Sequence, residues 1–142
     1  MPSPKILLDT DILSELFKEI DPKVKANAAR YQLEYAQLTF TSLSALEVLS
    51  GLERKQASAK LRRMQALLDT NEEIEPVRDD YRLAAEIIGR LGQSGFEIGL
   101  VDPTIAACAI RRGFGVATGN FAHFDYIRQV GYGYHLENWR VA

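Results

Sequence analysis

Short apolar segments alternate with longer helical patterns along this chain, and the alternation restricts the folds open to it. The strand-like segments lie at residues 5–9, 37–42, 72–77, 115–118 and 132–139. Helical patterns separate them, and strands joined through helices pair in parallel with right-handed crossovers. We therefore predict an α/β fold with a central, mainly parallel sheet of four to five strands flanked by helices.

Helix signals between these segments come from caps and from amphipathic spacing. Asp21 followed by Pro22 is typical of a helix start. Gly51 is expected to weaken or end the helix in which it lies, and Pro76 indicates an edge strand or a strand end. The predicted helices cover residues 11–18, 22–35, 43–52, 58–70, 78–95, 103–112 and 120–127.

Size and composition favour one ordinary globular domain. The chain has 142 residues, of which 46% are hydrophobic, so we treat residues 1–142 as a single domain. No apolar run is long enough to cross a membrane, and the N-terminus lacks the apolar stretch of a signal peptide. We therefore expect a cytoplasmic protein with no membrane partner. The single cysteine, Cys108, excludes an internal disulfide, and we expect it to be buried in a helix.

The net charge of −2 counts against broad, nonspecific binding to nucleic acid, which usually needs a basic face. It does not exclude an enzyme that acts on nucleic acid. Acidic residues gathered around metal ions would lower the total charge, while arginines and lysines elsewhere could still contact phosphates.

Four polar residues follow the predicted strands or open the helices after them. Asp9 follows the first strand, and Glu47 lies in the first turns of the helix after the second. Asp102 opens the helix in "DPTIAACAI", and Asn120 follows the fourth strand. The ligand crevice of an open parallel sheet lies beyond the carboxyl ends of its strands. We therefore expect these four side chains to converge at one end of the sheet.

Each of these residues also has a purely structural explanation. Asp9, Asp102 and Asn120 stand where a helix cap is expected, and Ser44 with Glu47 matches the S-x-x-E capping box. Capping does not explain why a glutamate lies inside an otherwise apolar helix, where we expect it to border the inward face. Grouped carboxylates repel one another and raise each other's pKa values, a cost that a divalent cation removes.

An oxygen-rich ligand set favours Mg²⁺ or Mn²⁺ over softer metals. Neither His123 nor His135 has the spacing of a zinc pair. A site of this kind supports phosphoryl transfer or phosphodiester hydrolysis, because metal ions neutralise the phosphate and lower the pKa of an attacking water.

Several segments, in a fixed order, resemble PIN-domain ribonucleases and most closely the VapC-like toxins of type II toxin–antitoxin pairs. They are "LLDTDIL", "TSLSALEVLSGL", "IGLVDPTIAACAI", "VATGNFAHF" and "HLENW", and they span about Ile6 to Trp139. The resemblance implies a PIN-like three-layer fold and a Mg²⁺- or Mn²⁺-dependent endoribonuclease that cleaves structured RNA, either tRNA or rRNA. It also implies a homodimer and an antitoxin that inhibits the enzyme.

The resemblance further assigns roles to individual residues. Asp9 and Asp102 match acids that touch the metal directly. Glu47 and Asn120 match positions that hold it through water or complete a second metal site. The polar residues that line the pocket are matched by Thr10 and Thr118.

Two positions depart from the family's usual pattern. Asp11 stands where asparagine is more frequent, so it either adds charge to the pocket or only favours the helix N-terminus. His123 stands where an acid is frequent, and it either contacts RNA phosphate or is an exposed helix residue. With one carboxylate fewer, a second metal is expected to bind weakly or only with substrate.

Other interpretations stay open. A PIN nuclease could process RNA or DNA without being a toxin, and a catalytically weak PIN domain could be a binding module with a DNA-binding partner. A receiver-like or phosphatase-like domain also clusters acids at strand ends, but receivers need a lysine after a late strand, and "GVATGN" has none.

Large apolar side chains on two predicted helical regions also have two explanations. They either complete the core or form a groove for an antitoxin segment, whose basic side chain would then reach the acidic pocket. They are Leu13, Leu16, Phe17, Leu61, Met64 and Leu68.

Overall fold

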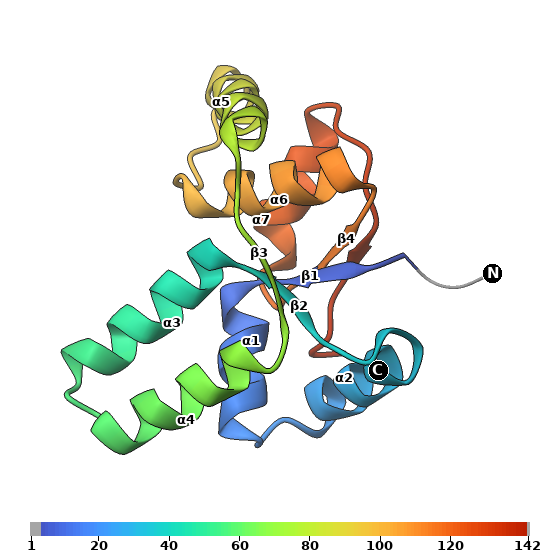
Figure 1. The fold of residues 1–142 in the computed structure, drawn as a ribbon. Coiled ribbons are helices and arrows are strands. Elements are labelled where there is room, and N and C mark those ends of the chain that lie inside the picture. Colours follow the sequence, from blue (N-terminus) through green and yellow to red (C-terminus); the bar gives the residue numbers. More distant parts are fainter. Residues whose placement is uncertain (1–3, 142) are drawn as a thin grey trace.

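The computed structural model describes residues 4–141 as three layers, with a sheet between two groups of helices (Figure 1). All strand pairs are parallel, and the strand order is β3-β2-β1-β4-β5. The strands are β1 (Ile6–Leu8), β2 (Thr39–Thr41), β3 (Glu72–Ile74), β4 (Gly115–Ala117) and β5 (Leu136–Glu137). The predicted α/β fold with a parallel sheet is confirmed.

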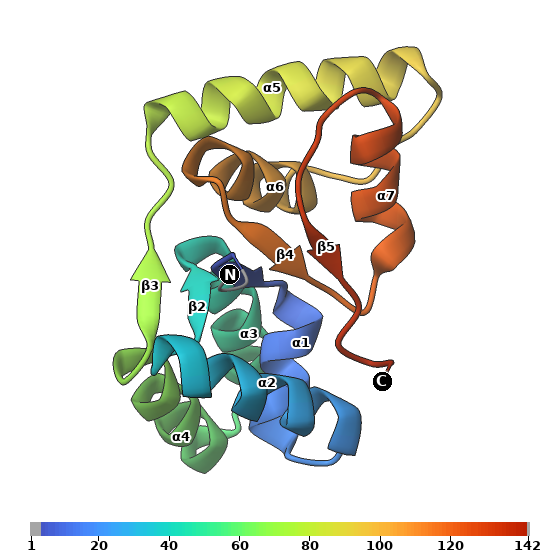
Figure 2. The same ribbon diagram turned by 90° about the vertical axis from the view of Figure 1, so that its right-hand side faces the viewer.

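Helices cover both faces of the sheet (Figure 2). Helices α1 to α4 and helices α5 to α7 lie on opposite faces, and a separate cluster of buried apolar side chains fills each side. The helices are α1 (Thr10–Lys18), α2 (Pro22–Tyr35), α3 (Ser42–Arg54), α4 (Ser58–Asp69), α5 (Arg78–Gln93), α6 (Val101–Arg112) and α7 (Phe121–Gln129). Cys108 is buried in α6, as predicted. Across residues 4–141, no helix combines the length and apolarity that crossing a membrane requires.

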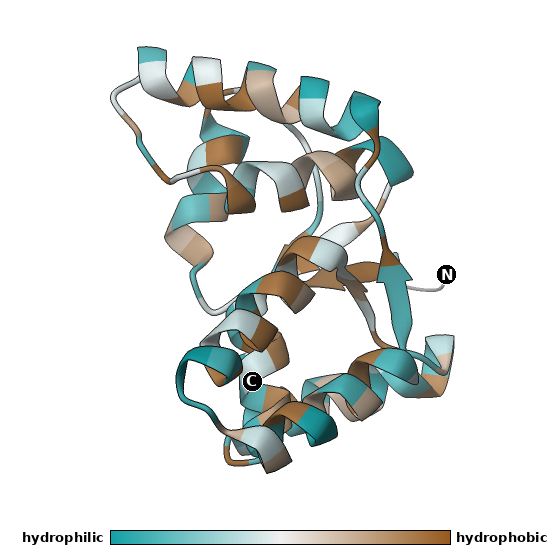
Figure 3. Ribbon diagram, turned by 60° about the vertical axis from the view of Figure 1, so that its left-hand side comes forward, coloured by the Kyte–Doolittle hydropathy of each residue, from teal (hydrophilic) through white to brown (hydrophobic). Residues whose placement is uncertain are grey.

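The middle strands owe their position to continuous apolar sequence. Strands β1, β2 and β4 are fully buried, whereas the outer strands are only partly so. Figure 3 shows edge strand β3 as hydrophilic and the centre of the sheet as hydrophobic. Leu8 at the end of β1 pairs with Phe40 of β2 and with Ala117 of β4. The residues that follow these strands therefore emerge side by side at one edge of the sheet.

Several boundaries differ from the predicted ones. Helix α3 continues through Gly51 to Arg54, because a glycine inside a helix costs only about 1 kcal/mol, which the packing of neighbouring turns offsets. Helix α6 begins at Val101 rather than after Asp102. The last strand is limited to Leu136–Glu137, since only two residues of β4 pair with it.

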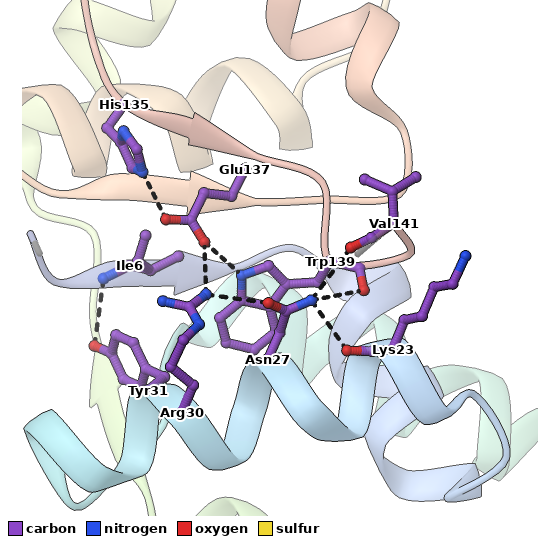
Figure 4. A network of polar contacts seen from close by, with 9 residues as sticks. All are labelled: Ile6, Lys23, Asn27, Arg30, Tyr31, His135, Glu137, Trp139 and Val141. Atoms are coloured by element: carbon purple, nitrogen blue, oxygen red, sulfur yellow. Dashed lines mark hydrogen bonds and ion pairs between the residues drawn. The ribbon is translucent and has the colours of Figure 1, made fainter.

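A polar network fastens the C-terminal segment to α2 (Figure 4). Asn27 Nδ2 donates to the carbonyl oxygen of Trp139 at 3.2 Å, and Arg30 forms an ion pair with Glu137 at 3.2 Å. The buried Trp139 indole donates to Glu137 at 2.9 Å. These contacts hold the next residue, Arg140, beside the end of the central strands.

Candidate active site

The Asp9 side chain links the end of β1 to the end of β4 through a hydrogen bond. It follows β1 and is only 5% exposed. Its Oδ1 accepts a hydrogen bond from Thr10 N at 2.7 Å, so Asp9 does cap α1. Its Oδ2 accepts from Thr118 Oγ1 at 2.8 Å, and Thr118 follows β4. One oxygen therefore supports the helix, while the other is held by a residue from the neighbouring strand.

Glu47 reaches the same edge from α3. Its Oε1 accepts a hydrogen bond from Thr10 Oγ1, which also lies 3.3 Å from Ser44 Oγ. Glu47 is exposed, so the prediction that it borders the inward face is wrong. The capping-box interpretation is wrong as well, because Thr41 is the N-cap and its hydroxyl accepts from Ser44 N at 3.2 Å. Since the cap of α3 is made by Thr41, the Glu47 carboxylate is directed to Thr10 instead.

A third group of side chains connects the starts of α6 and α7. His123 Nδ1 lies 3.0 Å from Asp102 Oδ2 and 2.9 Å from Asn120 Nδ2. The N-cap of α6 is Leu100, so the interpretation of Asp102 as a cap is wrong. Asn120 occupies the N-cap position of α7, but its side chain makes no capping hydrogen bond. Both side chains are therefore turned toward His123 instead of their own helix backbones.

Asp11 contacts the turn between β4 and α7 at this edge of the sheet. Its Oδ2 accepts a hydrogen bond from Gly119 N at 3.0 Å and lies 3.7 Å from Arg140 Nε. Its Oδ1 is buried without a hydrogen-bond partner among the described residues. Arg140 also lies 3.5 Å from Glu15 of α1. Asp11 therefore does more than favour a helix N-terminus, because it fixes the turn between β4 and α7.

Replacement of Gly119 by alanine is expected to disturb this turn. A Cβ there would lie 2.1 Å from Arg140 Nε and 2.5 Å from Asp11 Oδ2, so both side chains must shift. We expect the free energy of unfolding, measured by urea titration, to fall by about 1–3 kcal/mol. Gly133→Ala is the control, because a Cβ at Gly133 meets nothing within 4 Å. Equal losses in the two variants would contradict this account.

Burial and neighbouring charges raise the pKa values of Asp9 and Asp102 at this edge. Burial, followed by the charges of Asp102 and Asp11, raises the pKa of Asp9 to about 8. Burial also raises the pKa of Asp102, and the charges of Glu47 and Asp11 add to this, although the hydrogen bond from His123 opposes it. A positive charge among these groups would reverse both shifts. Carboxyl groups with strongly perturbed pKa values mark a candidate functional site.

The side chains fit a divalent cation in their chemistry. Within residues 4–141, no three His, Cys, Asp or Glu side chains are close enough together to hold a metal ion by themselves. The predicted ligands Asp9, Glu47 and Asp102 are thus not gathered at bonding distance. Even so, two carboxyls with raised pKa values and the unpartnered Asp11 Oδ1 all gain from a cation, and oxygen ligands suit Mg²⁺ or Mn²⁺.

A cleft of about 250 Å³ opens beside Thr10 and Glu47, between α1, α3 and α4. Its lining combines apolar side chains with three exposed lysines, Lys18, Lys55 and Lys60. Nothing in the sequence singles out Lys18 or Lys60, because only helix packing brings them to one cleft. The same cleft therefore contains the three lysines and, through Thr10 and Glu47, reaches the acidic edge of the sheet.

The family model of the PIN domain matches residues 6–128. This chain belongs to the PIN domain family. The match covers β1 to α7, and so includes all eight predicted site residues of the PIN domain. No curated protein gives a significant match.

Solved structures share the fold of this PIN domain. DNA-bound VapBC from Salmonella typhimurium is 23% identical, with a TM-score of 0.82 over 96% of this chain and 98% of that one. FitAcB from Neisseria gonorrhoeae is 22% identical, with a TM-score of 0.79 over 96% and 99%. The sarcin–ricin loop cleaving toxin VapC20 from Mycobacterium tuberculosis is 15% identical, with a TM-score of 0.64 over 90% and 96%. The predicted resemblance to PIN domains is confirmed.

Proposed function

We propose that this PIN domain is a metal-dependent endoribonuclease that cleaves structured RNA, tRNA or rRNA, as the toxin of a VapBC-type toxin–antitoxin pair. The main support is the acidic edge of the sheet. There the charge of Asp102 raises the pKa of Asp9, the charge of Glu47 raises the pKa of Asp102, and Asp9 and Glu47 both accept hydrogen bonds from Thr10. Family membership supports nuclease activity. The description of VapC20 as a toxin that cleaves the sarcin–ricin loop supports RNA as the substrate.

Each residue has a defined part in the proposed reaction. Asp9 and Asp102 would bind the metal directly, while Glu47 and Asn120 would hold water around it. Thr118 keeps Asp9 in place through the hydrogen bond to Oδ2. A bound Mg²⁺ or Mn²⁺ would neutralise the scissile phosphate and lower the pKa of the attacking water.

The RNA backbone is assigned to the cleft beside Thr10 and Glu47. Lysines position a nucleic acid through its phosphates, which carry no sequence information themselves. Lys18, Lys55 and Lys60 provide such charge within a chain whose net charge is −2. Structured RNA is recognised largely by shape and by unstacked loops, which suits a basic cleft of this kind.

An antitoxin is the proposed protein partner. Solved complexes of VapBC and FitAcB support such a partner. The predicted groove is reduced in extent, since three of its six apolar residues, Leu13, Met64 and Leu68, are buried in the core. Leu16 and Phe17 are only partly buried and line a further cleft, where an apolar antitoxin segment would fit. The homodimer stays a prediction, and sedimentation analysis of the purified protein would test it.

Incubation of the purified protein with total cellular RNA tests the proposed activity. We expect discrete fragments with Mg²⁺ or Mn²⁺ and intact RNA with EDTA. The fragments should carry 3′-hydroxyl and 5′-phosphate ends, which end mapping identifies together with the target. Single-stranded and duplex DNA test the alternative of DNA processing. Intact RNA in every metal arm, from folded protein without antitoxin, would contradict the proposal and favour a binding module.

A further inference from the structure

Gly51 lies inside α3, although the fold does not require a glycine there. Glycine is among the poorest helix formers and is needed mainly where φ is positive or where another group approaches the backbone closely. Gly51 meets neither condition, because its φ is not positive and an added Cβ would have nothing within 4 Å. The absence of a side chain therefore leaves open space without relieving any clash.

That open space is the middle of the cleft between α1, α3 and α4 (Figure 1). The rows of residues that α1 and α3 contribute have the same order, at intervals of one helical turn: a residue of the acidic edge, a small residue, and a lysine. The rows are Thr10, Ser14 and Lys18 on α1, and Glu47, Gly51 and Lys55 on α3 and its C-cap. Since each helical residue adds about 1.5 Å, about 12 Å separates the acidic end of the cleft from the basic end.

The walls of this gap match the chemistry of a nucleobase. Its size of about 250 Å³ lies just below the range of about 300–1,000 Å³ for pockets that enclose drug-sized ligands, so it suits one base better than a helical segment. The apolar wall is formed by Phe17, Val48, Leu52 and Met64. The Ser14 hydroxyl has no hydrogen bond within residues 4–141, whereas Ser50 donates to Glu47 O at 3.1 Å. Ser14 is therefore available to the hydrogen-bonding edge of a base.

The charges at the two ends of the cleft match the phosphates on either side of such a base. Lys18, Lys55 and Lys60 are exposed, and among the described residues none of them takes part in an ion pair. Lysines of this kind position a nucleic acid through its phosphates. At the other end, a divalent cation held by the acids would receive the scissile phosphate. A single unstacked nucleotide thus has the same order of groups as the cleft.

We propose that the gap beside Gly51 binds one unstacked nucleobase of the RNA, against Phe17, with a neighbouring phosphate at the three lysines. The inference rests on the proposed function, because it places the nucleotide next to the bond that is cut. Recognition of unstacked bases by aromatic side chains is the usual way in which proteins read single-stranded RNA.

Filling the gap tests the proposal without disturbing the fold. Gly51→Leu adds a side chain where a Cβ meets nothing, and it replaces a poor helix former by a good one. Urea titration should therefore show no loss of stability. Gly89→Leu is the matched control, because Gly89 lies inside α5, away from the cleft, and a Cβ there also meets nothing within 4 Å.

Two strands of equal length and charge serve as probes, a ten-nucleotide oligouridylate and an abasic ribose–phosphate strand. Binding is measured by fluorescence anisotropy in Ca²⁺, which takes oxygen ligands as Mg²⁺ does, and a gel confirms that the strands stay intact. The wild type should bind the oligouridylate at least about tenfold more tightly, the scale of one stacked base. Gly51→Leu should lose this preference, Gly51→Ala should lose part of it, and Gly89→Leu should keep it.

The salt dependence of binding separates the base from the phosphate. Lys55→Ala should keep the preference for the oligouridylate but reduce the slope of log affinity against log salt concentration by about 0.7, the value for one phosphate contact on a single strand. Gly51→Leu should leave that slope unchanged. A general disturbance of the cleft would alter both quantities in both variants and would overturn the proposal.

The remaining outcomes separate the base site from the ribonuclease. Equal affinity of the wild type for the two strands, or affinity for neither, overturns the base site. A preference that survives in Gly51→Leu also overturns it and leaves the cleft to a protein segment. Preference for the oligouridylate in a protein that leaves every RNA intact with Mg²⁺ and Mn²⁺ overturns the ribonuclease and keeps the base site.

Discussion

Asp9→Asn is expected to lower RNA cleavage at least about 100-fold, since even loss of a residue that only orients metal ligands costs 10–100-fold. Asparagine has the same shape and still accepts the hydrogen bond from Thr10 N, but it lacks the charge that a cation requires. Single-turnover cleavage of a mapped RNA fragment measures the change. Asp69→Asn, at the exposed end of α4, is the control and should retain full activity.

The same substitution should stabilise the metal-free protein. The folded pKa of Asp9, about 8, exceeds its ordinary value of 3.8, so the native state holds a proton that the unfolded chain releases. The stability that protonated Asp9 contributes is therefore complete below about pH 4 and declines as the pH rises toward 8. At pH 8 in EDTA, Asp9→Asn should be more stable by a few kcal/mol, on a scale of about 1.4 kcal/mol per pKa unit.

Saturating Mn²⁺ should reduce the difference between the two proteins. A ligand that binds only the native state adds about 2.7 kcal/mol at 100 times its dissociation constant. The wild type gains this stabilisation, whereas the variant has lost a ligand. Urea titrations with Mn²⁺ or with EDTA measure both effects. If the variant were less stable than the wild type in EDTA at pH 8, the raised pKa of Asp9 would be contradicted.

Asp80→Ala should produce the largest loss of stability, about 3–5 kcal/mol, because it breaks a buried ion-pair network. Asp80 is fully buried at the start of α5. Its carboxylate accepts hydrogen bonds at 2.8 Å from Arg111 and Arg112 of α6, and one from Val77 N at 2.8 Å. The network thus fastens α5 to the helix that carries Asp102.

The pH dependence of this network has the opposite sign to that of Asp9. Burial by itself would raise the pKa of Asp80, but hydrogen bonds from Arg112, Val77 N and Arg111 outweigh it and hold the pKa well below 3.8. The stabilisation is present above about pH 4 and is lost as the pH falls further. The difference between the wild type and Asp80→Ala should therefore shrink in urea titrations below pH 4.

Asp79→Asn is the control for this second prediction. Asp79 precedes Asp80 in the chain, but the Asp79 side chain is 65% exposed and lies 3.7 Å from Arg111. Exposed ion pairs contribute about 0–1 kcal/mol, so this variant should unfold almost like the wild type. If Asp80→Ala cost no more than Asp79→Asn, the α5–α6 network would have no part in stability.

Local sequence was a good guide to the sheet but a poor one to side-chain environment. Strand and helix alternation predicted the parallel topology because a helix between two strands returns the chain so that the strands pair in parallel. Glu47 was predicted to border the core from its apolar neighbours, and it is exposed because α3 presents that face to the cleft. The cap interpretation is wrong at Asp102, since Leu100 is the N-cap of α6, whereas Asn120 occupies the N-cap position of α7 without a capping hydrogen bond. A cap depends on backbone geometry that residue type only favours.

The sequence by itself determined the fold class and the positions of the acids at strand ends, since both depend on order along the chain. Only the tertiary structure decided which of these groups share an environment. The contact of Asp102 with His123 and that of Thr10 with Glu47 join residues far apart in sequence. The burial of Asp9 and Asp102, which raises the pKa of each, depends on how layers of helices close over the sheet, and no single segment specifies this.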